Sequence, residues 1–281
     1  MVPLCILAQE DLMDIVDRET DAEKVEAEQT FKGTRLINGH SIETRDKGVL
    51  DVIISHRFGR VNSGAYQLFG LDESNVRLGV DYGITDQLNA GVGRNSFEKT
   101  YDGFLKYKIL RQRQGSSGNT PVSLAAFSSV ALKTLHTGDP AGEPPLKSRL
   151  TFSYQFIIAR KFSPAFSLQV VPTLVHRNSV TEEQGPNDIY ALGGGGRIKL
   201  TKRVSLNAEY YYQFNNNGNG TLQNSVAIGF DIETGGHVFQ LHFTNSRAMI
   251  EKGFITETTG NFLDGDIHFG FNISRVFQVA E

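Results

Sequence analysis

The sequence is dominated by runs in which apolar and polar residues alternate. From Val204 to Phe214, every second residue is apolar or aromatic, and most residues between them are polar. Successive side chains of a β-strand point to opposite faces, so a period of two places the apolar residues on one face. Twelve such runs of 10 to 13 residues follow one another. They span residues 48–58, 74–84, 86–97, 101–112, 121–133, 148–160, 165–177, 188–200, 203–214, 221–233, 236–245 and 265–277.

The length and spacing of these runs indicate strands that cross a membrane. They exceed the ordinary strand of about 5 or 6 residues and match a tilted strand through a bilayer. Most links after odd-numbered runs are long, as at residues 246–264, and most links after even-numbered runs are short, as at residues 234–235. This layout is typical of bacterial outer-membrane barrels. Because twelve strands return the chain to its starting side, we expect both termini at the short-turn, periplasmic end.

The polar face of the runs decides which side of the barrel meets lipid. It carries charges of both signs, which a dry core would not hold without partners. Twelve strands with apolar residues inside would also enclose a large void, whereas eight strands are just filled by side chains. We therefore predict an all-β fold, a closed antiparallel up-and-down transmembrane β-barrel of about 12 strands around a hydrated lumen. A two-sheet sandwich and a periplasmic barrel are the alternative folds.

Charged and histidine side chains on the polar face are the candidates for lining the lumen, where they would tune ion preference. His242 and His268 lie on sequential runs, so a metal or pH role is the alternative to that of an ordinary lumen residue. The candidates are Asp51, Arg57, Arg77, Asp81, Lys106, Lys108, Arg149, Arg197, Lys199, Glu209, Asp231, His242 and His268.

The residues before the barrel, which is expected over residues 48–277, divide into three segments. Residues 1–8 (MVPLCILA) are apolar and resemble the remnant of a secretory signal, although a native N-terminus is the alternative. Residues 9–30 hold nine acidic and two basic residues, so they carry −7 and leave +4 on the rest of a chain whose net charge is −3. We expect this acidic segment in the periplasm, as a solvated tail or a docking site for a periplasmic protein.

Residues 31–47 have some strand character, but a thirteenth wall strand would put the acidic segment outside the cell. We therefore expect them outside the wall, as a plug in the lumen or a cover at its periplasmic mouth.

The sequence holds no motif for catalysis, a cofactor or a metal. No two of the seven histidines have zinc-type spacing. The glycine run 193–196 lacks the Lys-Ser/Thr of a phosphate loop. Ser153 and His268 lie on the polar face without a hydrolase motif. Asp139 and Glu143 would suit a surface cation, but a solvated loop is the interpretation we favour for this pair. We expect no catalytic, cofactor or metal residue, no enzyme activity and, without a basic patch interleaved with aromatics, no nucleic-acid binding.

Three stretches carry a resemblance to a known family. They are FKGTRLINGH (Phe31–His40), GVLDVIISHRFG (Gly48–Gly59) and the ending GFNISRVF (Gly270–Phe277). Together they resemble an uncharacterised family of bacterial outer-membrane β-barrel proteins, and the similarity spans most of residues 30–277. The resemblance implies the fold and an outer-membrane location. It brings no established catalytic or ligand residues, so none is assigned here on that ground.

Two functions from different classes fit these features. The first is a channel or transporter for small polar solutes, which the charged lumen face favours. The second is a closed barrel that acts as a scaffold or partner for periplasmic or surface proteins, through residues 9–30 and the loops 59–73 and 246–264. An outer-membrane hydrolase is a third alternative. The expected partners are outer-membrane lipid, small polar solutes and a periplasmic protein.

Overall fold

The structure is a computed structural model that describes residues 25–26, 29–114, 119–138, 140, 142–181, 185–215, 221–234 and 237–280. Residues 1–8, predicted as a signal remnant, and most of the acidic segment 9–30 lie outside the described residues.

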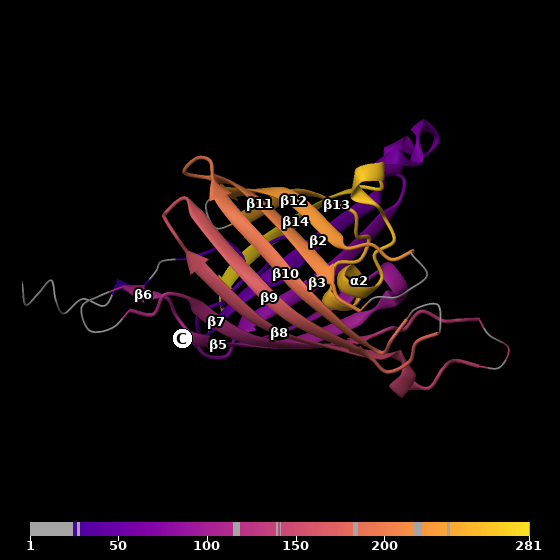
Figure 1. Cartoon of the computed structure of the whole chain (residues 1–281), viewed down its shortest axis with the longest axis horizontal. Helices are drawn as coiled ribbons and strands as arrows, with labels where there is room; N and C mark the ends of the chain where they lie inside the picture. The colour runs from indigo at the N-terminus through magenta and orange to yellow at the C-terminus, as the bar shows by residue number, and fades with distance from the viewer. Residues whose placement is uncertain are drawn as a thin grey trace, which may run out of the picture.

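Twelve antiparallel strands form a closed barrel (Figure 1), which confirms the predicted fold. Consecutive barrel strands pair along the chain, and the last strand pairs with the first to close the ring. The strands are β2 (Val49–Arg60), β3 (Ser74–Gly83), β4 (Leu88–Asn95), β5 (Tyr101–Leu110), β7 (Ser123–Leu132), β8 (Leu150–Lys161), β9 (Phe166–Arg177), β10 (Asp188–Lys199), β11 (Val204–Gln213), β12 (Ser225–Thr234), β13 (His237–Thr244) and β14 (His268–Gln278).

The remaining described elements are short. No helix among the described residues is long and apolar enough to cross a membrane. Outside the barrel wall, β1 and β6 pair as a separate two-stranded sheet. These elements are β1 (Val25–Glu26), β6 (Arg113–Gln114), α2 (Glu251–Thr256) and the 3-10 helices η1 (Val61–Ser63), η2 (Ala65–Gly70), η3 (Phe97–Lys99), η4 (Leu146–Arg149) and η6 (Phe262–Asp264).

The observed strands differ from the predicted runs by a few residues at their ends. The largest difference is at the start of β12, which begins at Ser225 rather than at residue 221. There the Gln223 N–H donates to Thr258 O (2.8 Å) in the β13–β14 link. The Asn224 side chain accepts from Gln213 N (3.0 Å). These bonds take the place of strand pairing at residues 223 and 224, so β12 begins later than the sequence predicts.

Side chains alternate between the two faces of the wall as the sequence pattern predicts. On β8, Gln155 is 3% exposed, whereas its neighbour Phe156 is 54% exposed. The same contrast separates the lumen-facing Lys106 (1%) from the outward-facing Leu105 (55%) on β5. The outer surface of the barrel is therefore apolar and the inner surface largely polar, which is the arrangement of a barrel surrounded by lipid.

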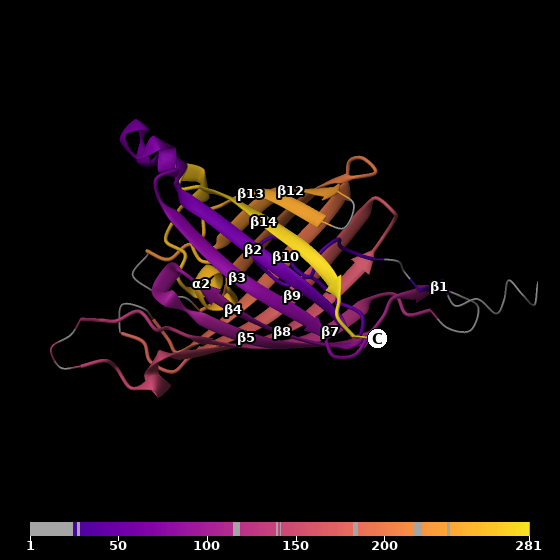
Figure 2. The ribbon, with the colours of Figure 1, turned by 180° about the vertical axis from the view of Figure 1, so that it is seen from behind.

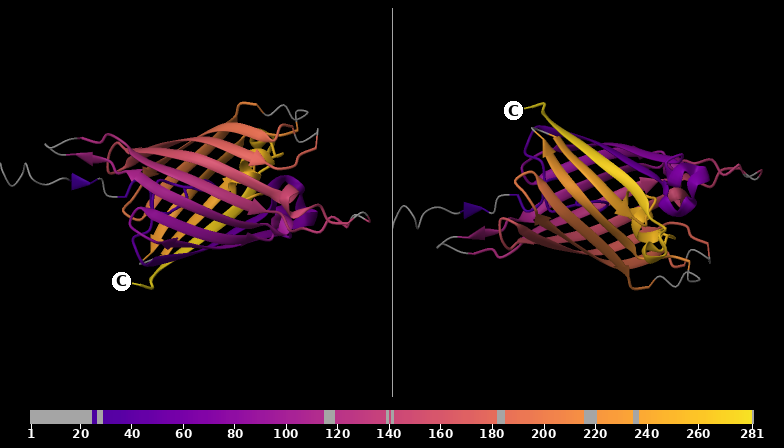
Figure 3. Two further views of the ribbon diagram at one scale, coloured as in Figure 1. Left: turned by 90° about the horizontal axis from the view of Figure 1, so that it is seen from below. Right: turned by 90° about the horizontal axis from the view of Figure 1, so that it is seen from above.

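The two ends of the barrel differ. One end carries the C-terminus, β1 and short turns such as residues 162–165 and 200–203 (Figures 2 and 3). The opposite end carries the long links, among them residues 133–149 and 245–267. Both described ends of the chain therefore lie at the short-turn end.

Two segments outside the wall fill the lumen. The first, the N-terminal insert, comprises residues 30–43, and Leu36 and Ile42 within it are each 1% exposed. The second, the loop insert, comprises residues 245–260 and includes α2, which lies at the long-loop end of the barrel in Figure 1. All six residues of α2 are buried. Much of the link between β13 and β14, considered above as a binding segment for partner proteins, thus folds inward.

Candidate functional site: the occupied lumen

A carboxylate on the wall binds the N-terminal insert through its main chain. Glu209 on β11 accepts hydrogen bonds from the backbone N–H groups of Ile37 (3.2 Å), Asn38 (2.8 Å) and Gly39 (3.2 Å). A tight turn aims these groups at one point, because Leu36 N donates to Gly39 O (2.8 Å). Three converging N–H donors favour the ionised form of this carboxylate, and hydrogen bonds to an ionised acceptor are stronger than neutral ones.

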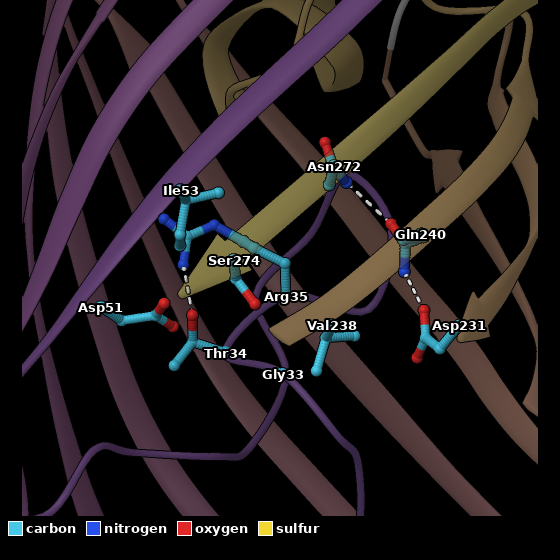
Figure 4. Close-up of a pocket in the computed structure, with 10 residues that line it drawn as sticks. All are labelled: Gly33, Thr34, Arg35, Asp51, Ile53, Asp231, Val238, Gln240, Asn272 and Ser274. Carbon is cyan, nitrogen blue, oxygen red and sulfur yellow. Dashed lines mark hydrogen bonds between the residues drawn. The ribbon is translucent and has the colours of Figure 1, made fainter. Parts of the chain in front are cut away.

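Wall side chains also satisfy the carbonyl groups of the N-terminal insert. Gln240 donates to Leu36 O (2.6 Å), and Asn272 donates to Ile37 O (3.2 Å). Across the lumen, Gln169 donates to His40 O (2.9 Å). Figure 4 shows Asn272, Gln240 and Asp231 joined in a chain on one side of the lumen. Buried main-chain groups need such partners, so the wall replaces the water that would otherwise solvate this turn.

Several lumen charges occur in pairs. Asp81 accepts from the Thr34 hydroxyl (2.8 Å) and from Arg35 Nη1 (3.0 Å) of the N-terminal insert. Within the wall, Arg77 binds Asp102 with two nitrogens, one of them at 3.0 Å. Burying a charge is costly unless it is paired and hydrogen-bonded, so these pairs let a charged wall surround a filled lumen.

Gly39 fits against Tyr211 of β11 at very short range. A Cβ atom on Gly39 would lie 2.0 Å from Tyr211 Oη and 3.0 Å from Tyr211 Cζ. Tyr211 is only 2% exposed, so it has little room to move away. A residue without a side chain is therefore required at position 39 for this turn to reach Glu209.

Arg57 on β2 holds both inserts at once. Its Nη1 donates to the carbonyls of Ser246 (2.8 Å) and Ala248 (2.6 Å) in the loop insert. Its Nη2 donates to Asn38 Oδ1 (2.6 Å) in the N-terminal insert. The guanidinium is fully enclosed, with Arg57 1% exposed. One wall residue thus fixes the two inserts relative to each other.

The two inserts also meet directly. His40 Nε2 lies 3.8 Å from Glu251 Oε1 of α2. Tyr211, which contacts Gly39, also packs edge-on against Phe254 of α2, with ring centroids 5.0 Å apart. Burial raises the pKa of Glu251 to about 7 and lowers the pKa of His40 well below its ordinary value.

Part of the lumen face is apolar, which the sequence reasoning missed. Phe31, Leu36 and Ile42 of the N-terminal insert pack on this strip, and Phe254 and Ile255 of the loop insert pack beside it. The available signal was the apolar character of both faces of some runs, such as residues 165–177, which indicates a strand buried on both sides. The strip comprises Phe104, Ala125, Phe127, Ile157, Ala159, Val171, Val175, Ile189 and Ala191.

The cavities of the lumen lie where the two inserts leave room. Between the N-terminal insert and the short-turn half of the wall, a cavity of about 30 Å³ lies among residues such as Arg35, Asp51 and Ser274 (Figure 4). Such a volume holds one or two water molecules. Larger cavities of about 500 Å³ and 440 Å³ lie at the short-turn and long-loop ends, beside Lys108 and Arg247 respectively. Among the described residues, the two inserts therefore occupy the lumen between these two larger cavities.

Most of the predicted lumen residues face the interior and contact the inserts or one another. Arg149 lies in η4 rather than in a strand, and it and Lys199 are half-buried near opposite ends of the barrel. The other eleven, all on wall strands and buried, are Asp51, Arg57, Arg77, Asp81, Lys106, Lys108, Arg197, Glu209, Asp231, His242 and His268.

The structure separates the residues considered for other chemistry. His242 Nε2 contacts an Arg57 nitrogen (3.1 Å), whereas His268 Nδ1 contacts Phe58 O (2.9 Å). Ser153 on β8 lies across the ring from His268 on β14, so no nucleophile–base pair forms between them. Within the described residues, no group of three or more His, Cys, Asp or Glu side chains could hold a metal. Asp139, considered with Glu143 for a surface cation, lies outside the described residues.

A closed antiparallel barrel with an apolar outside and a polar inside is a membrane β-barrel, of the class that outer membranes contain. The chain belongs to the family described as "Membrane bound beta barrel domain (DUF5777)", whose model matches residues 31–277. A search of curated proteins found no match.

Solved structures with a similar barrel include porins. The KdgM porin is 8% identical, with a TM-score of 0.47, and the match covers 82% of this chain and 99% of that one. The KdgM porin in complex with disordered oligogalacturonate gives the same identity and coverage, with a TM-score of 0.49. A triple mutant of the Rhodopseudomonas blastica porin is 11% identical, with a TM-score of 0.34, over 72% of this chain and 55% of that one.

Proposed function

We propose that the protein is a gated outer-membrane channel for small polar solutes, closed in this conformation by its two inserts. The observation that carries this proposal is the chemistry of the contact between Glu209, Gln240, Asn272 and the main chain of the N-terminal insert. Water and polar solutes can make the same hydrogen bonds, so the wall can remain satisfied when the insert leaves. The ion pairs within the wall would then line the open pore and set its ion preference.

In this proposal the short-turn end, with both termini, faces the periplasm. The N-terminal insert is then continuous with the acidic segment 9–30, which a periplasmic protein can bind. Such binding would withdraw the insert from the short-turn side, while lipid surrounds the apolar outer face. No cofactor takes part.

Single-channel conductance of the purified barrel in a planar bilayer tests the proposal. We expect the full chain to stay silent and a variant lacking residues 9–43 to conduct. A variant lacking only residues 9–29 is the matched control, because it keeps the N-terminal insert and should also stay silent. Silence of every variant, including one that also lacks the loop insert, would refute the channel.

A scaffold is the second candidate, and one observation favours it. Phe31, Leu36 and Ile42 are each 1% exposed against the apolar strip of the wall. Burying each such side chain contributes roughly 1.5–3 kcal/mol, so withdrawal of the N-terminal insert is costly. A permanently filled barrel would then serve to hold a periplasmic or surface protein. Pull-down with the full chain, compared with the variant lacking residues 9–29, tests this role.

A further inference from the structure

A pocket at the long-loop end is rich in cations. It has a volume of about 240 Å³ and lies where β7, β8 and β9 end beside α2. This volume lies just below the usual range of small-molecule sites, so it fits a small solute. Its charged lining residues are Lys133, Arg149, Arg177, Lys252, Glu98 and Glu257.

Adjacent strands bring three of these cations together. Lys133 follows β7, and its N–H donates to Arg149 O (3.2 Å) just before β8. Arg177, at the end of β9, is the register partner of Thr151 on β8. Like charges on neighbouring strands repel one another, so this grouping lowers stability unless anions compensate it.

The two carboxylates of the pocket already bind its lysines. Lys252 Nζ lies 2.7 Å from Glu98 Oε2 and also binds Glu257. Lys133 binds the other oxygen of Glu98. Both carboxylates therefore already bind the lysines, and among the described lining residues four cations face two anions.

Arg149 is the cation with the fewest partners. Its side chain makes no hydrogen bond or ion pair within the described residues, and its buried Nε–H has no acceptor there. The carboxylate of Glu143 interacts with Arg149 electrostatically but does not line the pocket. It accepts a hydrogen bond from the Thr137 N–H (2.9 Å) and contacts His136 Nδ1. Arg177, by contrast, donates to Pro186 O (2.6 Å). A buried guanidinium donor without an acceptor favours an anionic ligand, because the fork of an arginine matches a carboxylate.

We propose that this pocket binds a small carboxylate-bearing solute through Arg149 and Arg177, with Lys133 beside them. The inference rests on the proposed channel for its role and deepens it, since it names the class of solute that reaches the long-loop end. Because Lys252 belongs to α2, the bound carboxylate lies directly against the loop insert that closes the lumen.

Isothermal titration calorimetry of the full chain in detergent, at neutral pH and low salt, tests the site. The probe is succinate, and its uncharged diamide, succinamide, is the control ligand. We expect succinate to bind and succinamide not to bind. We also expect the affinity for succinate to fall as salt is raised from about 0.05 M to about 0.5 M, because a partly exposed charge pair is screened.

The variant Arg149→Gln should weaken succinate binding about tenfold, the loss expected for one charge-assisted contact. Arg160→Gln is the matched control, because Arg160 lies on the outer face over the Phe162 ring and should bind succinate like the unmodified chain. Equal binding by the two variants, or no binding of succinate by the unmodified chain, would overturn the site. Either result leaves the conductance test of the channel unaffected. If Arg149→Gln does not fold, the comparison of succinate with succinamide on the unmodified chain still tests whether the site binds a carboxylate.

Discussion

At Gly39, the absence of a side chain allows the N-terminal insert to stay in the lumen. A Cβ atom at this position would lie 2.0 Å from Tyr211 Oη. Overpacking of this kind costs about 1–3 kcal/mol. We expect Gly39→Ala to loosen the N-terminal insert, so that trypsin cleaves at Lys32 and Arg35 faster than in the unmodified chain.

Gly33→Ala provides the matched control for this change. A Cβ atom on Gly33 would find its nearest atom at 3.5 Å, an ordinary contact, and so this variant should resist trypsin like the unmodified chain. Tyr211→Phe removes the nearest atom and should partly restore protection in the double variant. Equal protection of Gly39→Ala and Gly33→Ala would contradict the steric argument.

The carboxylate of Glu209 makes a separate contribution at the same turn. Glu209→Gln keeps the size of the side chain but removes the charge that strengthens three backbone hydrogen bonds. Hydrogen bonds to charged groups are worth about 1.5–3 kcal/mol, so we expect the amides of residues 37–39 to exchange with solvent at least tenfold faster. Native-state hydrogen exchange measures this rate. Glu73→Gln, in a half-exposed ion pair with Arg247, should leave these amides unchanged.

Among the elements, α2 carries a buried acid, and its binding in the lumen should depend on pH. Glu251 is enclosed, and burial raises its pKa to about 7, with His40, Arg35, Arg77 and Asp102 around it. The protonated form therefore favours the bound state of the loop insert. This contribution is complete below the ordinary pKa of about 4.5 and is lost as pH rises through about 7.

We therefore expect hydrogen exchange across residues 248–257 to accelerate from pH 6 to pH 8.5 by more than the intrinsic change in rate. Glu251→Gln, compared at each pH, should remove the excess. An excess of the same size in Glu251→Gln would assign the effect to another group.

His40 should give the N-terminal insert the opposite dependence. Burial lowers its pKa, and the charges of Arg35, Lys106 and Arg77 lower it further, while Glu251 is the nearby acid. The neutral form favours the bound insert, so the stabilisation is present above the ordinary pKa of 6.5 and is lost as pH falls below it. We expect trypsin-resistant protein, prepared at pH 7.5, to lose protection of Lys32 and Arg35 after transfer to pH 5. His40→Gln should stay protected at both values.

The strands could be predicted from sequence because the alternation of lipid-facing and lumen-facing residues is visible within each strand. On β11, Tyr210 and Tyr212 face lipid and Glu209 faces the lumen, so alternation alone reveals the strand. The content of the lumen depends on contacts between distant residues instead. Nothing near Asn38 in the sequence indicates that Glu209, Arg57 and Thr244 will surround it. The six residues of α2 lack both a side-chain N-cap and the length that would make a helix evident from sequence.

At the scale of the whole barrel, the two inserts are obstacles in series along one path. The N-terminal insert enters from the short-turn end and the loop insert from the long-loop end, and they meet at His40 and Glu251. Removing one insert leaves the other to narrow the path, so the conductances gained from the two deletions should not add. We expect a larger conductance when residues 9–43 are deleted and a short Gly-Ser linker replaces residues 247–258 than the sum of the two single changes.

Planar-bilayer recordings of the four proteins measure this difference directly. A conductance in the double variant equal to that of either single variant would mean that one insert alone closes the lumen. Matched far-ultraviolet circular dichroism spectra would show that all four proteins keep the barrel.

The pairing of β14 with β2 has a consequence for biogenesis. The ring cannot be completed until the last strand has been synthesised and has found a partner more than 200 residues away. The N-terminal insert precedes every wall strand in the chain, and the loop insert lies between β13 and β14. Before the seam closes, both can be laid on an open, curved sheet from the side. After it closes, they can enter only through the two mouths. The closure of the ring by its first and last strands therefore favours a barrel that assembles around its own contents, in which the last step is the sealing of a compartment already filled.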